Sequence, residues 1–236
     1  MIIISFNYYC FIFIFGCCLG STSGVIAERL PMKQPIFFTH SQCIHCKKKL
    51  AFIDLIPIIS CLIQGFHCRY CLKQLPSIYL VEELLGGFFT LLVLKNGIDF
   101  SSFYIYIFLL QAFLLSLTDF LYWKVEPKIL YPLFLFLLSL HLFLNQTLFW
   151  KTGIGIFLLF TCFTYFTNNS MGYGDVILLS CWSILLGHIA ILHIIFLASI
   201  NGLLFCIINK LLFKKNYRKI PFVPFLSIGL FFYLYI

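Results

Sequence analysis

The stretch that decides the fold reads FYIYIFLLQAFLLSLTD, residues 103–119, and no charged residue precedes Asp119 in it. An apolar run of this kind is typical of a helix that lies in a membrane. The rest of the chain is similar: 62% of the 236 residues are hydrophobic, 30 are Phe and only 10% are charged. Soluble domains carry about 25% charged residues. The composition therefore excludes a soluble enzyme, a disordered tail and a coiled coil, and it predicts an all-α polytopic membrane protein.

Eight apolar segments are predicted to be membrane spans, although the sixth and seventh follow one another almost directly. They cover residues 2–24, 79–94, 103–118, 129–145, 150–167, 176–187, 189–208 and 221–236. We therefore expect about eight transmembrane helices. They divide the chain into a first span (1–27), a cytoplasmic loop (28–78) and a membrane-embedded core (79–236).

The first apolar run, Ile2 to Gly20, has two interpretations. The small residues at its end, with Cys17 and Cys18, are typical of a cleaved signal peptide or a lipoprotein signal. A signal peptide, however, opens with positive charge, and the first basic residue here is Arg29, after the run. We favour an uncleaved anchor whose N-terminus lies outside.

Basic residues concentrate in two connections between the apolar segments. Residues 28–77 contain seven and residues 209–220 contain five. They are Arg29, Lys33, Lys47, Lys48, Lys49, Arg69 and Lys73, then Lys210, Lys214, Lys215, Arg218 and Lys219. Positive loops stay in the cytoplasm, and the even number of spans between these two allows both to lie there. The net charge of +8 is thus better explained by basic loops that set the topology and contact anionic lipid headgroups than by binding to nucleic acid.

The same alternation assigns a side to the remaining connections. The cytoplasmic ones are 119–128 and 168–175, and the outer ones are 95–102 and 145–149. The outer connections carry few charges, as the charge rule requires.

The loop 28–78 contains two Cys-x-x-Cys pairs, which are Cys43 with Cys46 and Cys68 with Cys71. Each pair can present two sulfurs to one metal ion, so the spacing predicts a four-thiolate zinc site. So short a loop could hardly fold on a core of its own, and bound zinc would supply folding energy. The alternatives are four incidental cysteines or a disulfide, which a cytoplasmic location disfavours. His40, His45 and His67 lie nearby and could substitute as ligands, but a lone His is more often a surface residue, so they are left out of the ligand set.

The chain has only eight acidic residues, so each can be judged by its position. Glu82 and Glu83 open the second predicted span, where a helix N-terminus favours carboxylates. Asp119 ends the run quoted above, and Asp175 begins another run. An acid at the edge of a span is costly unless it has a partner or a role. The predicted topology places both aspartates at cytoplasmic ends of spans, at similar depth.

Two carboxylates that meet across helices can share one proton. One then acts as a base toward water and the other as an acid toward the scissile group. Gly172 and Gly174 leave room for a substrate backbone beside Asp175. Asp119 and Asp175 are therefore candidate catalytic residues. The alternative is that each caps a helix or pairs with a nearby lysine, Lys124 or Lys128.

In register, these features resemble the type IV prepilin peptidases, a family of membrane aspartic proteases, over nearly the whole chain. The similar segments are Gly20–Pro31, Cys43–Cys46, Asp54–Pro57, Cys68–Cys71, Val81–Leu84, Thr118–Asp119, Gly172–Asp175 and Ile220–Phe225. The GxGD motif at 172–175 is short by itself. In register with the cysteine pairs and the C-terminal segment, it is specific.

The resemblance implies an activity. Family members remove the short basic leader of prepilins and pseudopilins at the cytoplasmic membrane face, and many then methylate the new N-terminus with S-adenosylmethionine. It implies that Asp119 and Asp175 are the catalytic pair and that the four cysteines bind structural zinc. The implied partners are prepilins and the lipid bilayer, without direct nucleic-acid binding. Glu82, Glu83 and Glu126 are candidates to face the basic leader.

The short, Phe- and Ile-rich chain resembles the branch from low-GC Gram-positive bacteria, whose substrates build the competence pseudopilus. The resemblance therefore implies a multi-pass protein of the bacterial cytoplasmic membrane with its active site facing the cytoplasm. Three positions depart from the family pattern: Thr118 replaces the usual Ile, Lys128 a frequent Asp, and Ile177 a common Lys. Both aspartates are present, so the departures do not put proteolysis in question. They concern the pKa values of the two aspartates and methyl transfer.

Two other classes of protein are compatible with parts of this pattern. A non-enzymatic membrane scaffold, whose zinc loop binds a partner, would tolerate replacement of Asp119 and Asp175. A membrane thiol oxidoreductase needs one Cys-x-x-Cys pair with a lowered thiol pKa beside a redox partner. Two matched pairs in one cytoplasmic loop favour a metal site over redox activity.

Overall fold

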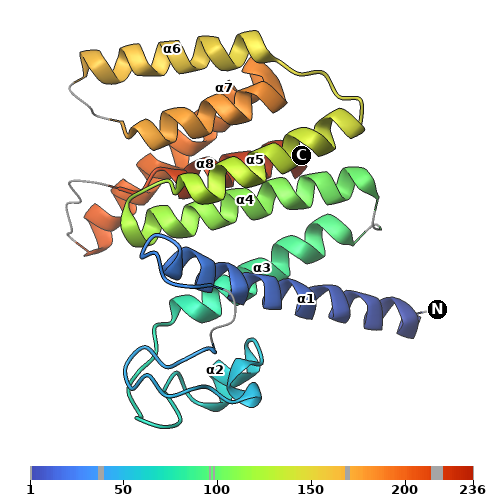
Figure 1. Ribbon diagram of the computed structural model, residues 1–236, viewed down its shortest axis with the longest axis vertical. Helices are drawn as coiled ribbons and strands as arrows, with labels where there is room; N and C mark the ends of the chain where they lie inside the picture. Colours follow the sequence, from blue (N-terminus) through green and yellow to red (C-terminus); the bar gives the residue numbers. More distant parts are fainter. Residues whose placement is uncertain are drawn as a thin grey trace. The chain divides into compact units, whose positions relative to one another are not determined.

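The computed structural model describes residues 2–36, 40–95, 97, 99–167, 171–213 and 220–235. Figure 1 shows its helices in chain order. They are α1 (Ile2–Arg29), the 3-10 helix η1 (Phe52–Leu55), α2 (Ile59–Ile63), α3 (Ile78–Leu94), α4 (Phe100–Tyr122), α5 (Pro127–Phe143), α6 (Trp150–Phe166), α7 (Tyr173–Phe213) and α8 (Val223–Tyr235). The predicted all-α class is confirmed. The second predicted basic loop, residues 209–220, is described only in part. Four of its basic residues lie outside the described residues: Lys214, Lys215, Arg218 and Lys219.

Length and apolar composition mark three of the described helices as able to cross a membrane. They are α1 from Asn7 on, α4, and α7 as far as Leu212. Helices α5, α6 and α8 are apolar but shorter. A helix satisfies all its backbone hydrogen bonds internally, which is what an apolar segment requires in lipid. The architecture is consistent with a membrane protein, whereas the count of eight spans stays a prediction.

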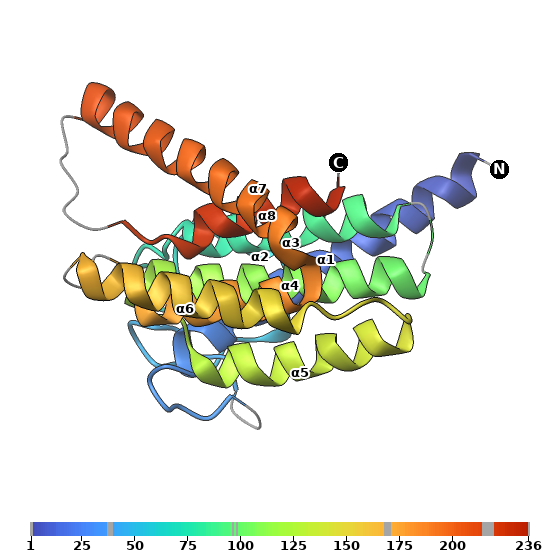
Figure 2. The same ribbon diagram turned by 90° about the horizontal axis from the view of Figure 1, so that it is seen from above.

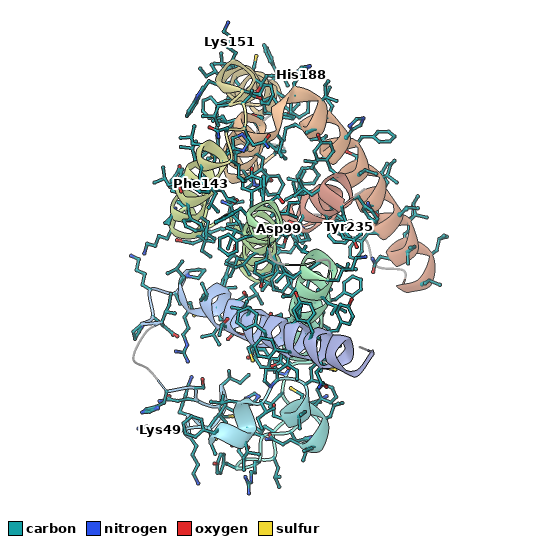
Figure 3. The ribbon with its side chains drawn as sticks, turned by 90° about the vertical axis from the view of Figure 1, so that its right-hand side faces the viewer. Lys49, Asp99, Phe143, Lys151, His188 and Tyr235 are labelled. Atoms are coloured by element: carbon teal, nitrogen blue, oxygen red, sulfur yellow. The ribbon has the colours of Figure 1, made fainter. Side chains whose placement is uncertain are left out.

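The sixth and seventh predicted spans lie in one continuous element, α7. They meet at Gly187, whose backbone is not helical, with φ 81° and ψ 176°. An L-residue with a side chain would be strained there, so glycine permits the change of direction. Figure 2 shows this change, and Figure 3 labels His188, the residue that follows it.

The chain divides into two compact units, an N-terminal unit (Met1–Ser102) and a C-terminal unit (Phe103–Ile236). The N-terminal unit contains α1 to α3 and the cysteine-containing loop. The C-terminal unit contains nearly all of α4 and the helices that follow it. The predicted division into 1–27, 28–78 and 79–236 separates segments by their side of the membrane rather than by compactness, and it stays a prediction.

In the N-terminal unit, α1 packs along α3 through glycines (Figure 1). A Cβ atom on Gly86 of α3 would lie 2.6 Å from the carbonyl oxygen of Gly16 and 2.7 Å from the Cα of Gly20 on α1. No side chain fits into this space. Small residues are the means by which membrane helices bring their backbones close together.

In the C-terminal unit, α4 is the central helix, and most of its side chains from Tyr104 to Asp119 are buried. The ring of Phe108 packs edge-on against Trp182 of α7 at 5.8 Å between centroids. The hydroxyl oxygens of Ser116 and of Ser227 on α8 lie 2.6 Å apart. The side chain of Gln111 donates a hydrogen bond to a backbone carbonyl of α5. Three helices of this unit therefore hold α4, and with it Asp119, in place.

Candidate active site and metal centre

The four cysteines form one cluster in the N-terminal unit, with all sulfurs within 4.8 Å of one another. The sulfurs of Cys43 and Cys71, one from each pair, are 3.9 Å apart. In a tetrahedral site with Zn–S bonds of about 2.3 Å, sulfurs are separated by about 3.8 Å. The cluster therefore has the donor set and the dimensions of a four-thiolate zinc site.

Each cysteine pair lies on a turn of the same construction. The N–H of Cys43 donates to the carbonyl of Lys48 (3.0 Å), as that of Cys68 does to Lys73 (2.9 Å). In each turn a residue with positive φ follows the second cysteine, Lys47 in the first and Leu72 in the second. Because both turns repeat this geometry, the two Cys-x-x-Cys motifs present their sulfurs in equivalent ways.

Backbone N–H groups in the first turn favour the thiolate form of Cys43. Burial opposes the ionisation of Cys43, but the N–H groups of Cys46 and His45 favour the charged sulfur and lower the pKa of the Cys43 thiol to about 6. The reverse holds at Cys71. The backbone N–H of Lys73 lowers the pKa of Cys71, whereas desolvation and the neighbouring sulfurs outweigh it and raise that pKa to about 11. The cluster thus favours a thiolate at Cys43 beside a protonated thiol at Cys71, and a bound cation would neutralise the thiolate.

The nearby histidines are not part of the cluster. The ring of His45 lies 3.2 Å from the carbonyl oxygen of Gln74, and that of His67 lies 2.6 Å from the carbonyl oxygen of Gly65. Among the described residues, the cluster that could hold a metal consists of cysteines alone.

The two candidate catalytic aspartates come together in the C-terminal unit. Asp119 lies in the last turn of α4 and is 6% exposed. Its Oδ2 accepts a hydrogen bond of 3.0 Å from the backbone N–H of Val223, where α8 begins. Asp175 lies in the first turn of α7, where its carboxylate interacts electrostatically with that of Asp119. Two acids far apart in the sequence therefore lie near enough for their charges to interact.

The alternatives for these acids can be compared with the structure. Within the described residues, neither aspartate forms an ion pair with Lys124 or Lys128. Asp175 does lie at a helix N-terminus, where a carboxylate is favoured. Asp119 lies at a helix end that offers no such stabilisation, so capping does not explain why both acids are here.

The two glycines of the GxGD motif differ in their surroundings. A Cβ atom on Gly174 would lie 2.8 Å from the Cβ of Val125, so this glycine permits close packing. The expectation that Gly174 leaves room for a substrate is wrong, because Val125 fills that space. Gly172 is exposed, and a Cβ there would lie 3.5 Å from Oδ2 of Asp175. Open space beside the pair therefore lies at Gly172.

Glu82 and Glu83 do not cap a helix, as their position in the sequence had suggested. Helix α3 begins at Ile78 and has no acid in its first turn. Both side chains are buried, and Oε2 of Glu83 accepts a 2.6 Å hydrogen bond from the N–H of Ile58 in the loop. The sequence could not reveal this, because it depends on the loop folding back onto α3. Val223 was missed for a related reason, since a backbone donor has no signature in residue type.

Comparison with known proteins identifies the class of this chain. A model described as the bacterial peptidase A24 N-terminal domain matches residues 14–96, and the type IV leader peptidase family model matches residues 103–207. Each match lies within one of the two units, and together they cover most of the chain. They define a protease. The chain belongs to the type IV leader peptidase family.

Similar proteins are named prepilin leader peptidase/N-methyltransferase. The one from Bacillus subtilis is 26% identical over 92% of this chain and 90% of its own length. The one from Myxococcus xanthus is 27% identical over 81% of this chain and 60% of its own length. The one from Pectobacterium carotovorum is 25% identical over 92% of this chain and 88% of its own length. No solved structure matches the chain significantly.

Proposed function

We propose that this protein is a membrane aspartic endopeptidase that removes the leader of prepilins or pseudopilins. The observation that carries the proposal is the electrostatic interaction between Asp119 and Asp175, which both lie inside the segment that matches the leader peptidase family. The match supports a protease, and the pair supplies the chemistry. A scaffold would have no need of two acids placed together in an apolar unit, where each is costly.

The pair acts as one acid and one base. Two carboxylates this close favour a singly protonated state, because like charges repel in a poorly polar environment. The N–H of Val223 stabilises the carboxylate form of Asp119 and fixes its orientation. Asp119 then takes a proton from water, the water attacks the scissile carbonyl, and Asp175 gives its proton to the substrate. The exposed Gly172 is where the substrate backbone approaches.

The membrane arrangement follows the predicted eight spans. The apolar helix of the pilin lies in the bilayer, its basic leader stays in the cytoplasm, and the scissile bond is then at the membrane edge. Both aspartates lie there if the basic loops are cytoplasmic. Glu126, which is half-buried just before α5, is a candidate to face the leader. Competence pseudopilins are the substrate class we favour, in the cytoplasmic membrane of a Gram-positive bacterium.

Zinc has a structural role in the N-terminal unit. Cys43, Cys46, Cys68 and Cys71 hold it, and it supplies cross-links that so short a loop lacks. Its loss should harm stability or substrate docking rather than the chemical step, because the catalytic pair lies in the other unit.

The peptidase is tested by leader cleavage in membranes that contain a candidate prepilin. Asp119→Asn and Asp175→Asn should each nearly abolish the mass loss that marks leader removal. Asp99→Asn, which changes an exposed acid outside the site, is the matched control and should cleave normally. Enzyme levels are equalised by immunoblot. Substantial cleavage by either catalytic-site variant at equal abundance would support the scaffold instead.

We also propose that the chain methylates the new N-terminus with S-adenosylmethionine. The support is the name of its relatives, each of which is called a prepilin leader peptidase/N-methyltransferase. Mass spectrometry of the mature pilin measures this directly. A single added methyl group on the N-terminal residue is expected, and an unmodified amine on fully cleaved product would leave a protease only.

A further inference from the structure

The part of the cysteine loop that contains η1 and α2 has the reverse of the polarity expected in water. Its large apolar side chains are exposed, and Phe52 is 92% and Ile63 78% exposed. Its polar side chains, Asp54, Ser60 and Gln64, instead line a cavity inside the N-terminal unit. An exposed apolar group of this size marks a surface that something covers. We call these exposed side chains the apolar ridge: Phe52, Ile53, Ile56, Ile59, Leu62 and Ile63.

Hydrogen bonds fix which side of this segment faces the protein. The carboxylate of Asp54 accepts hydrogen bonds from the N–H of Ala51 (3.0 Å) and from the side-chain amide of Gln64 (2.8 Å). The N–H of Ile58 donates to Glu83 of α3. Because these polar groups are satisfied on the inner side, the segment cannot turn over to bury the apolar ridge without breaking them.

The segment lies beside α1 rather than beyond its end. Helix α1 is long and apolar enough to cross a membrane as far as Arg29. A Cβ atom on Gly20 would lie 3.1 Å from the Cα of Glu83, so Glu83 is level with Gly20. Gly20 precedes Arg29 by nine residues, which is about 13 Å along a helix. Ile58, bonded to Glu83, therefore lies beside the span, and Figure 1 shows α2 alongside α1.

Helix α3, to which the segment is bonded, has an apolar exposed side of its own. Val81, Leu84, Leu85 and Phe88 are exposed and recur at the spacing of one helix face. In a membrane protein such a face contacts lipid. The apolar ridge thus belongs to a unit whose helices already present apolar side chains to the bilayer.

Basic residues flank the apolar ridge in the sequence. Lys47, Lys48 and Lys49 precede it, Arg69 and Lys73 follow it, and all five are exposed. The one acid in residues 44–75 is Asp54, whose carboxylate is bound within the loop. Apolar side chains with basic residues around them are typical of segments that lie in the headgroup region of an anionic membrane.

We propose that the apolar ridge inserts into the lipid bilayer beside α1 and α3. Its side chains lie among the acyl chains just below the headgroups, and the flanking basic residues contact anionic headgroups. Lipid then holds the cysteine loop at a fixed depth, in addition to the two helices at its ends. The proposal uses neither the aspartates nor the cysteine sulfurs, so it goes beyond the proposed peptidase and can fail independently of it.

The test is photocrosslinking of the full chain in nanodiscs of phosphatidylglycerol and phosphatidylcholine. Phe52, Ile63 and Gln74 are replaced one at a time by p-benzoylphenylalanine, which on illumination bonds to a neighbouring C–H group. The mass of the product identifies that neighbour. Gln74 is the matched control, since it is exposed in the same loop but polar and outside the apolar ridge. Phospholipid adducts should be at least about fivefold more abundant at Phe52 and Ile63 than at Gln74.

Two results would overturn the proposal. Crosslinks from Phe52 and Ile63 to another segment of the chain or to a second copy would show that protein covers the apolar ridge. Adducts no more abundant there than at Gln74 would show that it faces water. Nanodiscs of phosphatidylcholine alone should lower the adduct yield by about twofold or more, and an equal yield would contradict the role given to the basic residues.

The unaltered protein provides a second measurement, which stands even if a variant folds poorly. In nanodiscs that contain a phospholipid with a diazirine in its acyl chain, illumination should label the peptide that covers residues 50–63. Labelling of α1 and α3 without labelling of this peptide would contradict insertion of the apolar ridge.

Discussion

At the scale of single residues, Cys43 illustrates how the loop favours a thiolate that could bind a metal. Backbone N–H groups stabilise its sulfur as a thiolate and lower its pKa to about 6, although burial opposes ionisation. Desolvation and the neighbouring sulfurs keep Cys71 protonated near neutral pH, with a pKa of about 11. A bound zinc ion would neutralise the thiolate and replace the remaining thiol protons. The cluster therefore gains more from a metal than four independent cysteines would.

Replacing Cys43 and Cys46 together with Ser should remove the zinc. We expect about one zinc per chain in the wild-type protein and almost none in the double variant, because two thiolates cannot complete a tetrahedral site. Metal analysis of the purified protein measures the content. Cys162→Ser, at an exposed position on α6, is the matched control and should retain its zinc. Equal zinc in the double variant and the wild type would disprove the assignment.

The residues of the site were predictable to different degrees. Asp119 and Asp175 could be found because a charge at the edge of an apolar run is conspicuous. The cysteines could be found from their spacing. Glu82 and Glu83 were misinterpreted, because their role depends on a loop that folds back onto α3. Contacts of this kind arise from tertiary structure, and the position of a residue along its own helix does not reveal them.

At the scale of elements, the packing of α1 on α3 depends on glycines. Gly20→Ala places a methyl group against the backbone of Glu82, with no flexible side chain to move aside. We expect a loss of about 1–3 kcal/mol in the free energy of unfolding, as for overpacking in other interiors. Denaturant unfolding in detergent measures it.

The control for this variant is Gly155→Ala on α6. No atom lies within 4 Å of a Cβ built there. The added methyl should leave stability unchanged or raise it by up to about 1 kcal/mol through helix propensity. If both variants behaved alike, close packing of α1 and α3 would not be the reason for the glycine.

The helices themselves were largely predictable, because an apolar segment in lipid must satisfy its backbone by forming a helix. The residues at which the helices begin and end were less predictable. The span predicted at 103–118 is longer in the structure, since α4 runs from Phe100 to Tyr122. The glycines of α1 recur every fourth residue at 16, 20 and 24, a signal that could have predicted the α1–α3 contact. Gly187 interrupts α7 without any loop, so the hydropathy pattern alone left that boundary indistinct.

At the scale of the whole molecule, the topology makes a separate prediction. A reporter enzyme that works only in the cytoplasm should be active when fused at Lys49, a residue of the cysteine loop that is labelled in Figure 3. A reporter that works only outside should be active when fused at Asn145, in the turn after α5. The reason is the six predicted spans between the two basic loops. Outside activity at Lys49 would reverse the assigned orientation and place the catalytic pair on the wrong side for a cytoplasmic leader.

The central claim is that Asp119 and Asp175 act as one catalytic unit, and the rate of the double variant tests it most directly. Each single Asn variant should lower the rate of leader cleavage by roughly a thousandfold or more, since either change removes the shared proton or the base. Groups that act as a unit are non-additive, so Asp119→Asn with Asp175→Asn should cleave within about threefold of the slower single variant. A double variant whose loss equals the product of the two single losses would show two independent contributions and contradict the account.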